Sequence, residues 1–230
     1  MTTRGFNSYL RNRRDAGLRL AQELSHLRGR TDLLVLALPR GGVPVAYEIA
    51  HALHAPLDLL VVRKLGAPAQ PELAIGAIAS GGVRVLNLDL LRYEGVTDEE
   101  LERIAQREGR ELQRREGLYR GERPRPVIRG RQVLLVDDGL ATGATMRAAV
   151  EAVRREAPSR IVVAVPVGSA EAVADLEALA DEVVCPLVPG MLSSIGRWYL
   201  DFAQTEDQEV RELLRLAWAE EDQRNPGAQR

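Results

Sequence analysis

Five short stretches of this chain are apolar almost throughout and lack the alternation of apolar and polar residues that half-exposed strands show. They cover residues 33–38, 57–62, 132–136, 161–166 and 182–185. Segments with helical spacing of apolar residues lie between them, chiefly residues 43–53, 145–156 and 170–180. Strands that are buried on both faces and connected through helices form parallel sheets. We therefore predict an α/β fold with a parallel central sheet and helices on both faces.

Between the second and third of these stretches the pattern changes. Residues 73–87 resemble two short strands separated by Ser80-Gly81-Gly82. The sequence Thr97-Asp98-Glu99-Glu100 then has the spacing of a capping box, which opens a highly charged helix reaching about Tyr119. The mixed signs of its charges favour a solvated face. With 230 residues, the chain is long enough for one domain and an appended lobe.

Charge and cysteine content exclude several classes of partner. The formal net charge is -2, so no bulk electrostatic attraction to nucleic acid or to anionic membranes is expected. A single cysteine, Cys185, cannot form an internal disulfide and fits a reducing compartment. The first six residues are not an apolar leader, and no run approaches the ~20 apolar residues of a membrane span. We expect a cytoplasmic protein that binds neither nucleic acid nor membrane.

The third apolar stretch is followed by the motif with the most chemical content. Asp137 and Asp138 come first, and a loop rich in glycine and threonine, residues 139–145, then leads into a helix. Backbone N–H groups of such a loop, together with a helix N-terminus, bind phosphate, and the two carboxylates can accept hydrogen bonds from a sugar diol or from water on Mg²⁺. The pattern fits a ribose 5-phosphate. The alternative is an ordinary strand-to-helix turn in which the aspartates cap the helix.

The distribution of lysine in the chain indicates a second candidate functional position. Lysine and arginine together number 31, and only one of them, Lys64, is a lysine. Lysine carries a compact, rotatable charge, whereas the guanidinium of arginine is a planar fork. Either this position requires an ammonium group, or the lysine is an accident of sequence drift.

The segment 136–146 resembles the signature of type I phosphoribosyltransferases, and the resemblance extends over roughly residues 30–205. The whole chain is similar to a group of bacterial phosphoribosyltransferases of unassigned acceptor. The resemblance implies that Asp137 and Asp138 bind the ribose hydroxyls, directly or through water on Mg²⁺. It also implies a 5′-phosphate site at Ala141, Thr142, Gly143, Ala144 and Thr145.

The same resemblance implies a pyrophosphate loop after the first strand, at Pro39-Arg40-Gly41-Gly42. The N–H groups of Arg40, Gly41 and Gly42, with the Arg40 guanidinium, would bind the leaving pyrophosphate, and the family often has a non-proline cis peptide here, which we place between Pro39 and Arg40. A glycine-rich turn that merely ends a strand is the alternative. Arg63-Lys64, which we expect at the end of the second strand of the sheet, resembles a pair in orotate phosphoribosyltransferases whose lysine reaches pyrophosphate.

A small C-terminal hood that selects the acceptor is a further family feature. We expect a core over residues 1–185, with a charged helical insertion at about residues 88–126, and a hood segment with a C-terminal helix over residues 186–230. Trp198, Tyr199 and Phe202 fall within five positions of one another and either stack on a planar base or anchor the hood. The closing loop that the family uses has two candidates, residues 65–76 and 88–126.

Two functions follow from the resemblance. The first is a Mg²⁺-dependent enzyme that transfers phosphoribosyl from phosphoribosyl pyrophosphate to a nitrogenous base or amine, with Asp137, Asp138, Lys64 and Arg40 as its catalytic residues. The second is a regulator that binds phosphoribosyl pyrophosphate without turnover. The absence of an evident helix-turn-helix favours the enzyme. Family members are usually homodimers, so we expect the same here.

Overall fold

A five-stranded parallel sheet forms the centre of the computed structural model, which describes residues 9–224. Its strand order is β2-β1-β6-β7-β8. The strands are β1 (Leu33–Ala37), β2 (Leu57–Leu59), β6 (Gln132–Val136), β7 (Arg160–Ala164) and β8 (Glu182–Val184). Every residue of β1 and β6 is buried, as expected for strands covered on both faces. The predicted parallel α/β sheet is confirmed.

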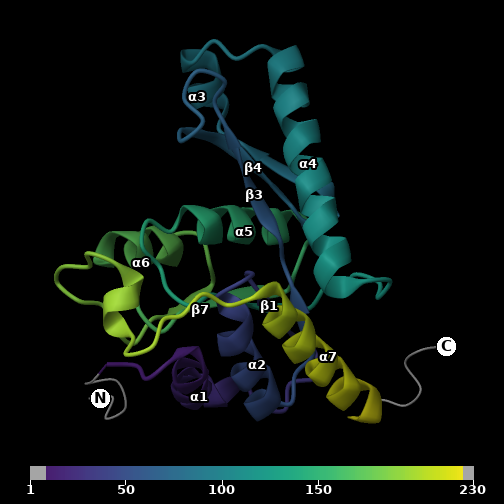
Figure 1. Ribbon diagram of the computed structural model, residues 1–230, viewed down its shortest axis with the longest axis vertical. Helices are drawn as coiled ribbons and strands as arrows, with labels where there is room; N and C mark the ends of the chain where they lie inside the picture. The colour runs from purple at the N-terminus through teal and green to yellow at the C-terminus, as the bar shows by residue number, and fades with distance from the viewer. Residues whose placement is uncertain (1–8, 225–230) are drawn as a thin grey trace.

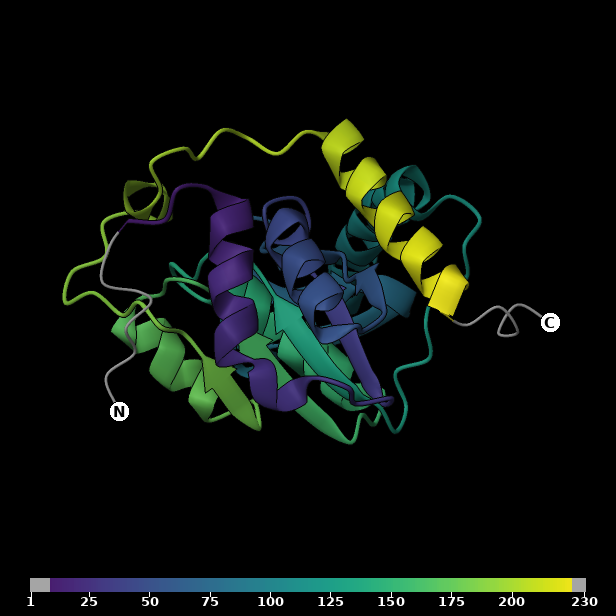
Figure 2. The same ribbon diagram turned by 90° about the horizontal axis from the view of Figure 1, so that it is seen from below.

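Helices cover the two faces of this sheet (Figures 1 and 2). On one face lie α1 (Arg13–Glu23), α2 (Gly42–Leu53) and α7 (Asp207–Arg224), and on the other lie α5 (Ala144–Arg155) and α6 (Ala170–Glu177). Successive side chains of a strand point to opposite faces, so Leu33 and Val35 pack in the first core and Leu34 and Leu36 in the second. Short 3-10 turns at Ser25–Leu27 and Ile195–Trp198 complete this part of the fold.

A second sheet projects from the core together with two helices (Figure 1). It is antiparallel, with β3 (Val62–Gly66), β4 (Ala74–Ala79) and β5 (Val83–Leu86) in that order. The two strands expected over residues 73–87 are therefore present, joined by the 3-10 turn Ser80–Gly82. Next come α3 (Leu88–Tyr93) and α4 (Asp98–Arg120). The capping box at the start of α4 is confirmed, with Thr97 and Glu100 bonding each other's backbone.

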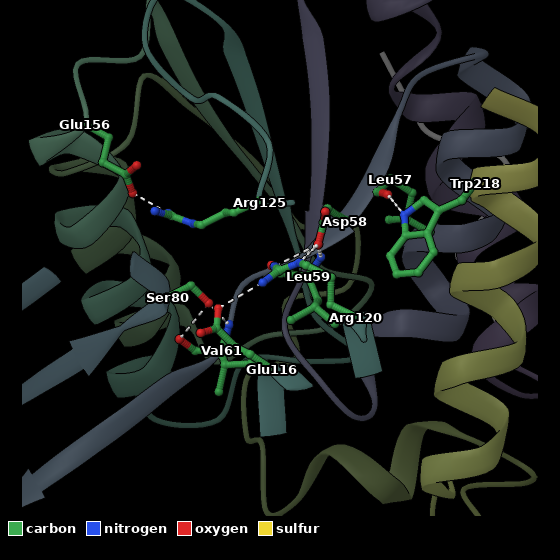
Figure 3. Close-up of polar contacts among 10 residues, drawn as sticks. All are labelled: Leu57, Asp58, Leu59, Val61, Ser80, Glu116, Arg120, Arg125, Glu156 and Trp218. Carbon is green, nitrogen blue, oxygen red and sulfur yellow. Dashed lines mark hydrogen bonds and ion pairs between the residues drawn. The ribbon is translucent and has the colours of Figure 1, made fainter. Parts of the chain in front are cut away.

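The second apolar stretch is not one strand of the central sheet, and this part of the prediction was wrong. Strand β2 ends at Leu59, and the chain then crosses to β3, where Arg63 and Lys64 lie. Buried Ser80 holds the crossing point, because its hydroxyl accepts a 2.9 Å hydrogen bond from the Val61 N–H (Figure 3). An unbroken apolar run does not reveal that its two halves pair with different sheets.

The buried pair Asp58 and Arg120 stabilises the same junction (Figure 3). The guanidinium donates to Oδ1 of Asp58 through Nε at 3.1 Å and Nη2 at 2.9 Å, and to the Leu59 carbonyl at 3.0 Å. The end of α4 is thereby fixed to β2, the edge strand of the central sheet. Arg120 is thus buried at the junction and does not lie on the solvated face expected for this helix.

The structure bears on the expectations about a membrane span and about an N-terminal leader. In the described range no helix is both long enough and apolar enough to cross a bilayer. The N-terminal residues on which the expectation about a leader depended, 1–6, lie outside the described residues.

Candidate functional site

The loops after β1 and β6 meet at the point where the strand order reverses. These strands are direct neighbours, paired residue for residue from Leu33 and Gln132 to Ala37 and Val136. β2 follows on one side and β7 on the other, so this is the topological switch point of the sheet. Open α/β sheets bind ligands in the crevice beyond the carboxyl ends of the strands at this point. Two of the predicted motifs lie here.

The turn Pro39–Gly42 packs directly against the acidic pair. A Cβ at Gly41 would come within 2.0 Å of Oδ2 of Asp138, and one at Gly42 within 2.6 Å of the Val136 carbonyl oxygen. Only glycine fits at either position with these neighbours in place. The peptide bond between Pro39 and Arg40 is cis, as expected. The turn predicted to bind pyrophosphate and the acids predicted to bind ribose are therefore parts of one site.

The side chain of Asp137 contacts the backbone of its neighbour. Its Oδ1 accepts a 2.8 Å hydrogen bond from the N–H of Asp138. Burial raises the pKa of Asp137 well above its ordinary value, and the negative charge of Asp138 acts in the same direction.

Asp138 has a partner that the sequence did not indicate. Arg13, at the first position of α1, places both Nε and Nη2 2.8 Å from Oδ2 of Asp138. Its Nη1 donates to the Ala203 carbonyl at 2.6 Å, and its guanidinium lies 4.0 Å from the centroid of the Phe202 ring. Arg13 is one arginine among many on a charged segment, and no local pattern distinguishes it. Its partner is 125 positions away in the chain.

In the loop before α5, the N–H of Leu140 donates to the Val167 carbonyl at 2.9 Å, and that of Ala144 makes only a long contact of 3.5 Å with Oγ1 of Thr142. Gly143 is the N-cap with φ of 72°, and as a glycine it has no side chain to cap the helix. Neither α5 nor α2, which begins at the Pro39–Gly42 turn, has an acidic residue in its first turn. The hydroxyl of Ser169 holds the loop from below by donating to the Ala141 carbonyl at 2.8 Å. Two uncapped helix N-termini thus flank the acidic pair, an arrangement suited to anionic groups on both sides of a sugar.

Lys64 and Arg63 lie on β3, away from the central strands. The Nζ of Lys64 donates to Glu72 through its Oε2 at 3.0 Å and its carbonyl at 3.1 Å. Arg63 donates to Oε2 of Glu108 at 3.0 and 2.6 Å. Lys64 also lines a cavity of about 550 Å³, shared with Ala144 and Thr145. The solitary lysine therefore faces the flank of the predicted phosphate loop, and its hydrogen bonds do not go to the Pro39–Gly42 turn.

Arg40 points toward the end of α4 and the start of α7. Its Nη1 lies 3.7 Å from Oδ1 of Asp207, which also accepts a 2.6 Å hydrogen bond from the Tyr119 hydroxyl. Burial, followed by this hydrogen bond, raises the pKa of Tyr119 to about 12. A pyrophosphate at the turn would therefore compete with Asp207 for the Arg40 guanidinium.

The three aromatic residues near the C-terminus differ in their surroundings. Tyr199 is buried, and its hydroxyl donates to the Asp138 carbonyl at 2.7 Å. The Phe202 ring packs on it with centroids 4.8 Å apart. These two residues anchor the segment on the acidic loop. Trp198 is partly exposed and stacks against Tyr9 at 6.0 Å, so a base-binding role stays a prediction for it.

The acidic pair has the donor chemistry of a magnesium site. Mg²⁺ binds oxygen and is usually held by one or two carboxylates, with substrate phosphates and waters completing its shell. Within residues 9–224 no three His, Cys, Asp or Glu side chains are grouped closely enough to hold a metal ion. Asp137 and Asp138 therefore fit an ion that arrives with a phosphorylated ligand, and do not form a closed protein cage.

Comparison with known proteins gives concordant results. The family model described as phosphoribosyl transferase domain matches residues 7–193. A Mycobacterium tuberculosis H37Rv protein, provisionally named a phosphoribosyl transferase, is 48% identical over 203 residues, which are 88% of this chain and 46% of that protein. The chain thus spans about half the length of the curated relatives it matches.

The fold has a close counterpart among solved structures. The crystal structure of TT1426 from Thermus thermophilus is 48% identical in sequence and matches with a TM-score of 0.80. The match covers 90% of this chain and 97% of that one.

Proposed function

Because this chain belongs to the phosphoribosyl transferase family, we propose that it is a Mg²⁺-dependent enzyme with phosphoribosyl pyrophosphate as donor and a nitrogenous base or amine as acceptor. One observation supports this most strongly. The Pro39–Gly42 turn contacts the acidic pair Asp137 and Asp138 at the switch point, between two uncapped helix N-termini. A sugar with phosphates at both ends matches this arrangement, in which two carboxylates lie between two helix N-termini.

Each part of the donor then has its place. The 5′-phosphate accepts hydrogen bonds from N–H groups of residues 141–145, and the hydroxyls of Thr142 and Thr145 donate to it. The ribose 2′- and 3′-hydroxyls donate to Asp137 and Asp138. The pyrophosphate accepts from the N–H groups of Arg40 and Gly41, and lies beside Gly42, whose N–H already donates to the Leu38 carbonyl at 3.1 Å.

The reaction transfers the 5-phosphoribosyl group from pyrophosphate to the acceptor nitrogen. The bond from C1 of ribose to the pyrophosphate oxygen breaks, the acceptor nitrogen forms a bond to C1, and that nitrogen gives up a proton. The protein contributes positioning and charge stabilisation, since no covalent step with a side chain is needed. Mg²⁺, when held by Asp137 and Asp138, would neutralise charge on the departing pyrophosphate. Arg40 would do the same after exchanging Asp207 for phosphate oxygens.

The finer assignments are part of the same proposal. Lys64 lines the same cavity as Thr145 and would reach the donor after releasing exposed Glu72. The acceptor would lie beside Trp198 in the hood over residues 186–230, next to the core of residues 1–185. We further propose that the protein is cytoplasmic and forms a homodimer. Size-exclusion chromatography with light scattering would test the oligomeric state.

The decisive assay measures pyrophosphate release. The protein is incubated with phosphoribosyl pyrophosphate, Mg²⁺ and each member of a panel of purine and pyrimidine bases. We expect release that depends on one base or a few related bases, and that is lost in the Asp137→Asn, Asp138→Asn double variant. Asp175→Asn, which removes an exposed carboxylate on α6, is the matched control and should retain it. Tight donor binding without base-dependent release would indicate the ligand-sensing regulator instead.

A further inference from the structure

The contacts of Arg13 join three separate parts of the chain at the site. Its side chain is 12% exposed and that of Asp138 is 17% exposed. Two of its nitrogens bond the same carboxylate oxygen, Oδ2, and a third bonds the carbonyl of Ala203. Arg13 bonds only Oδ2 of this carboxylate, so it holds one oxygen and does not occupy the other, Oδ1.

Arg13 is itself held in place from both sides. The side chain of Asn12 caps α1 by accepting from the Asp15 N–H at 2.9 Å. The carbonyl of the residue before this cap, Arg11, accepts from the Asp201 N–H at 2.9 Å, so the start of α1 is tied to the segment that carries Phe202 and Ala203. Further along the helix, a Cβ on Gly17 would lie 2.5 Å from the Val45 carbonyl, which shows how closely α1 packs on α2.

Arg14, the next residue along the helix, has different surroundings from Arg13. Arg14 has a side chain that is 76% exposed, and it pairs at 2.8 Å with Glu48 of α2, whose side chain is 10% exposed. It makes none of the contacts described for Arg13. The two arginines are therefore a matched pair for mutagenesis, equal in charge and adjacent in sequence.

We infer that Arg13 is a positioning residue for the donor site, which fixes the Asp138 carboxylate so that Oδ1 faces the ribose hydroxyls. The inference rests on the proposed function. Its positive charge also offsets the repulsion between two adjacent carboxylates, whose joint approach to one ligand would otherwise be unfavourable. The planar fork is essential to this role, because it bonds Oδ2 twice while its third nitrogen reaches Ala203 and its face lies over Phe202. An ammonium group cannot reproduce these contacts together.

The test compares Arg13→Gln, Arg13→Lys and Arg14→Gln with the parent protein. Binding of phosphoribosyl pyrophosphate with Mg²⁺ is measured by calorimetry, folding by thermal unfolding, and turnover as KM and kcat separately. We expect both Arg13 variants to bind the donor about tenfold more weakly or worse, with KM rising by more than kcat falls. Arg14→Gln should bind as the parent does.

Each outcome distinguishes the inference from the proposed function. Parent protein that fails to bind the donor overturns both. Donor binding that is equal in the parent and in Arg13→Gln overturns the positioning role alone, and so does full rescue by Arg13→Lys, which would reduce the role to charge. If the glutamine variant does not fold, donor binding by the lysine variant and a donor-bound structure of the parent decide whether Arg13 positions Asp138. Release of Asp138 by Arg13 in that complex would also overturn the inference.

Discussion

Replacing Arg120 by methionine should destabilise the protein strongly, although the change lies outside the proposed site. The side chains of Arg120 and Asp58 are only 6% and 5% exposed. Removing Arg120 leaves the Asp58 carboxylate buried, with the Leu59 N–H, 2.6 Å away, as its remaining hydrogen-bond donor. Breaking a buried pair by deleting one partner costs about 3–5 kcal/mol. For a chain of this size, that corresponds to a melting temperature lower by roughly 6–20 °C.

The stability of the Arg120→Met variant should also depend on pH in a specific way. Burial raises the pKa of Asp58 in the folded protein, while the charge of Arg120 opposes that rise. Removing Arg120 therefore raises the folded-state pKa further above the unfolded value of ~3.9. A raised folded-state pKa means stability that is present below the unfolded pKa and lost as pH rises through the folded one. The loss in free energy of unfolding of Arg120→Met, relative to the parent, should be small in acid and grow toward neutral pH.

Urea unfolding at several pH values measures both effects. Asp58→Asn combined with Arg120→Met should recover about 1–3 kcal/mol relative to the sum of the single changes, because no buried charge remains at position 58. Arg114→Met, which removes an exposed arginine paired with Glu111, is the control and should unfold as the parent does. An Arg120→Met variant with the parent's urea midpoint and slope at neutral pH would refute the reasoning.

Three further predictions address the site and the projecting helix. Gly41→Ala places a Cβ 2.0 Å from Oδ2 of Asp138 and should weaken donor binding, measured by calorimetry, by about tenfold or more, equivalent to about 1.4 kcal/mol; unchanged affinity would contradict the packing described. Lys64→Arg keeps the charge but not the rotatable ammonium, and should lower kcat more than it weakens ribose 5-phosphate binding; identical kinetics would exclude Lys64 from the mechanism. Thr97→Ala removes the capping box and should cost about 0.5–2 kcal/mol in urea unfolding with donor binding unchanged.

The fold was predictable where local pattern and global structure agree. Strands β1, β6, β7 and β8 coincide with the apolar stretches. Complete burial on both faces leaves a direct trace in the sequence of β1 and β6, whereas β8 is only half-buried. The crossing between β2 and β3 was not predictable. Apart from Asp58, residues 57–62 are apolar on both sides of it, and the hydrogen bond between Val61 and Ser80 is a tertiary contact.

The site divides in the same way. Asp137, Asp138 and the Pro39–Gly42 turn were candidates from the sequence, and they lie together because each follows a strand of the central sheet and parallel strands end at one edge. Arg13 was not a candidate, since its contact with Asp138 depends on where the start of α1 lies relative to β6. Lys64 was singled out correctly as unusual, but its position next to Glu72 depends on the second sheet.

A crystal structure with phosphoribosyl pyrophosphate and Mg²⁺ tests the central claim most directly. The account predicts one donor molecule lying across the switch point, with its 5′-phosphate at the N–H groups of residues 141–145, its ribose hydroxyls on Asp137 and Asp138, and its pyrophosphate at Arg40, Gly41 and Gly42. A donor bound elsewhere, or bound with its ribose away from the two aspartates, would contradict it.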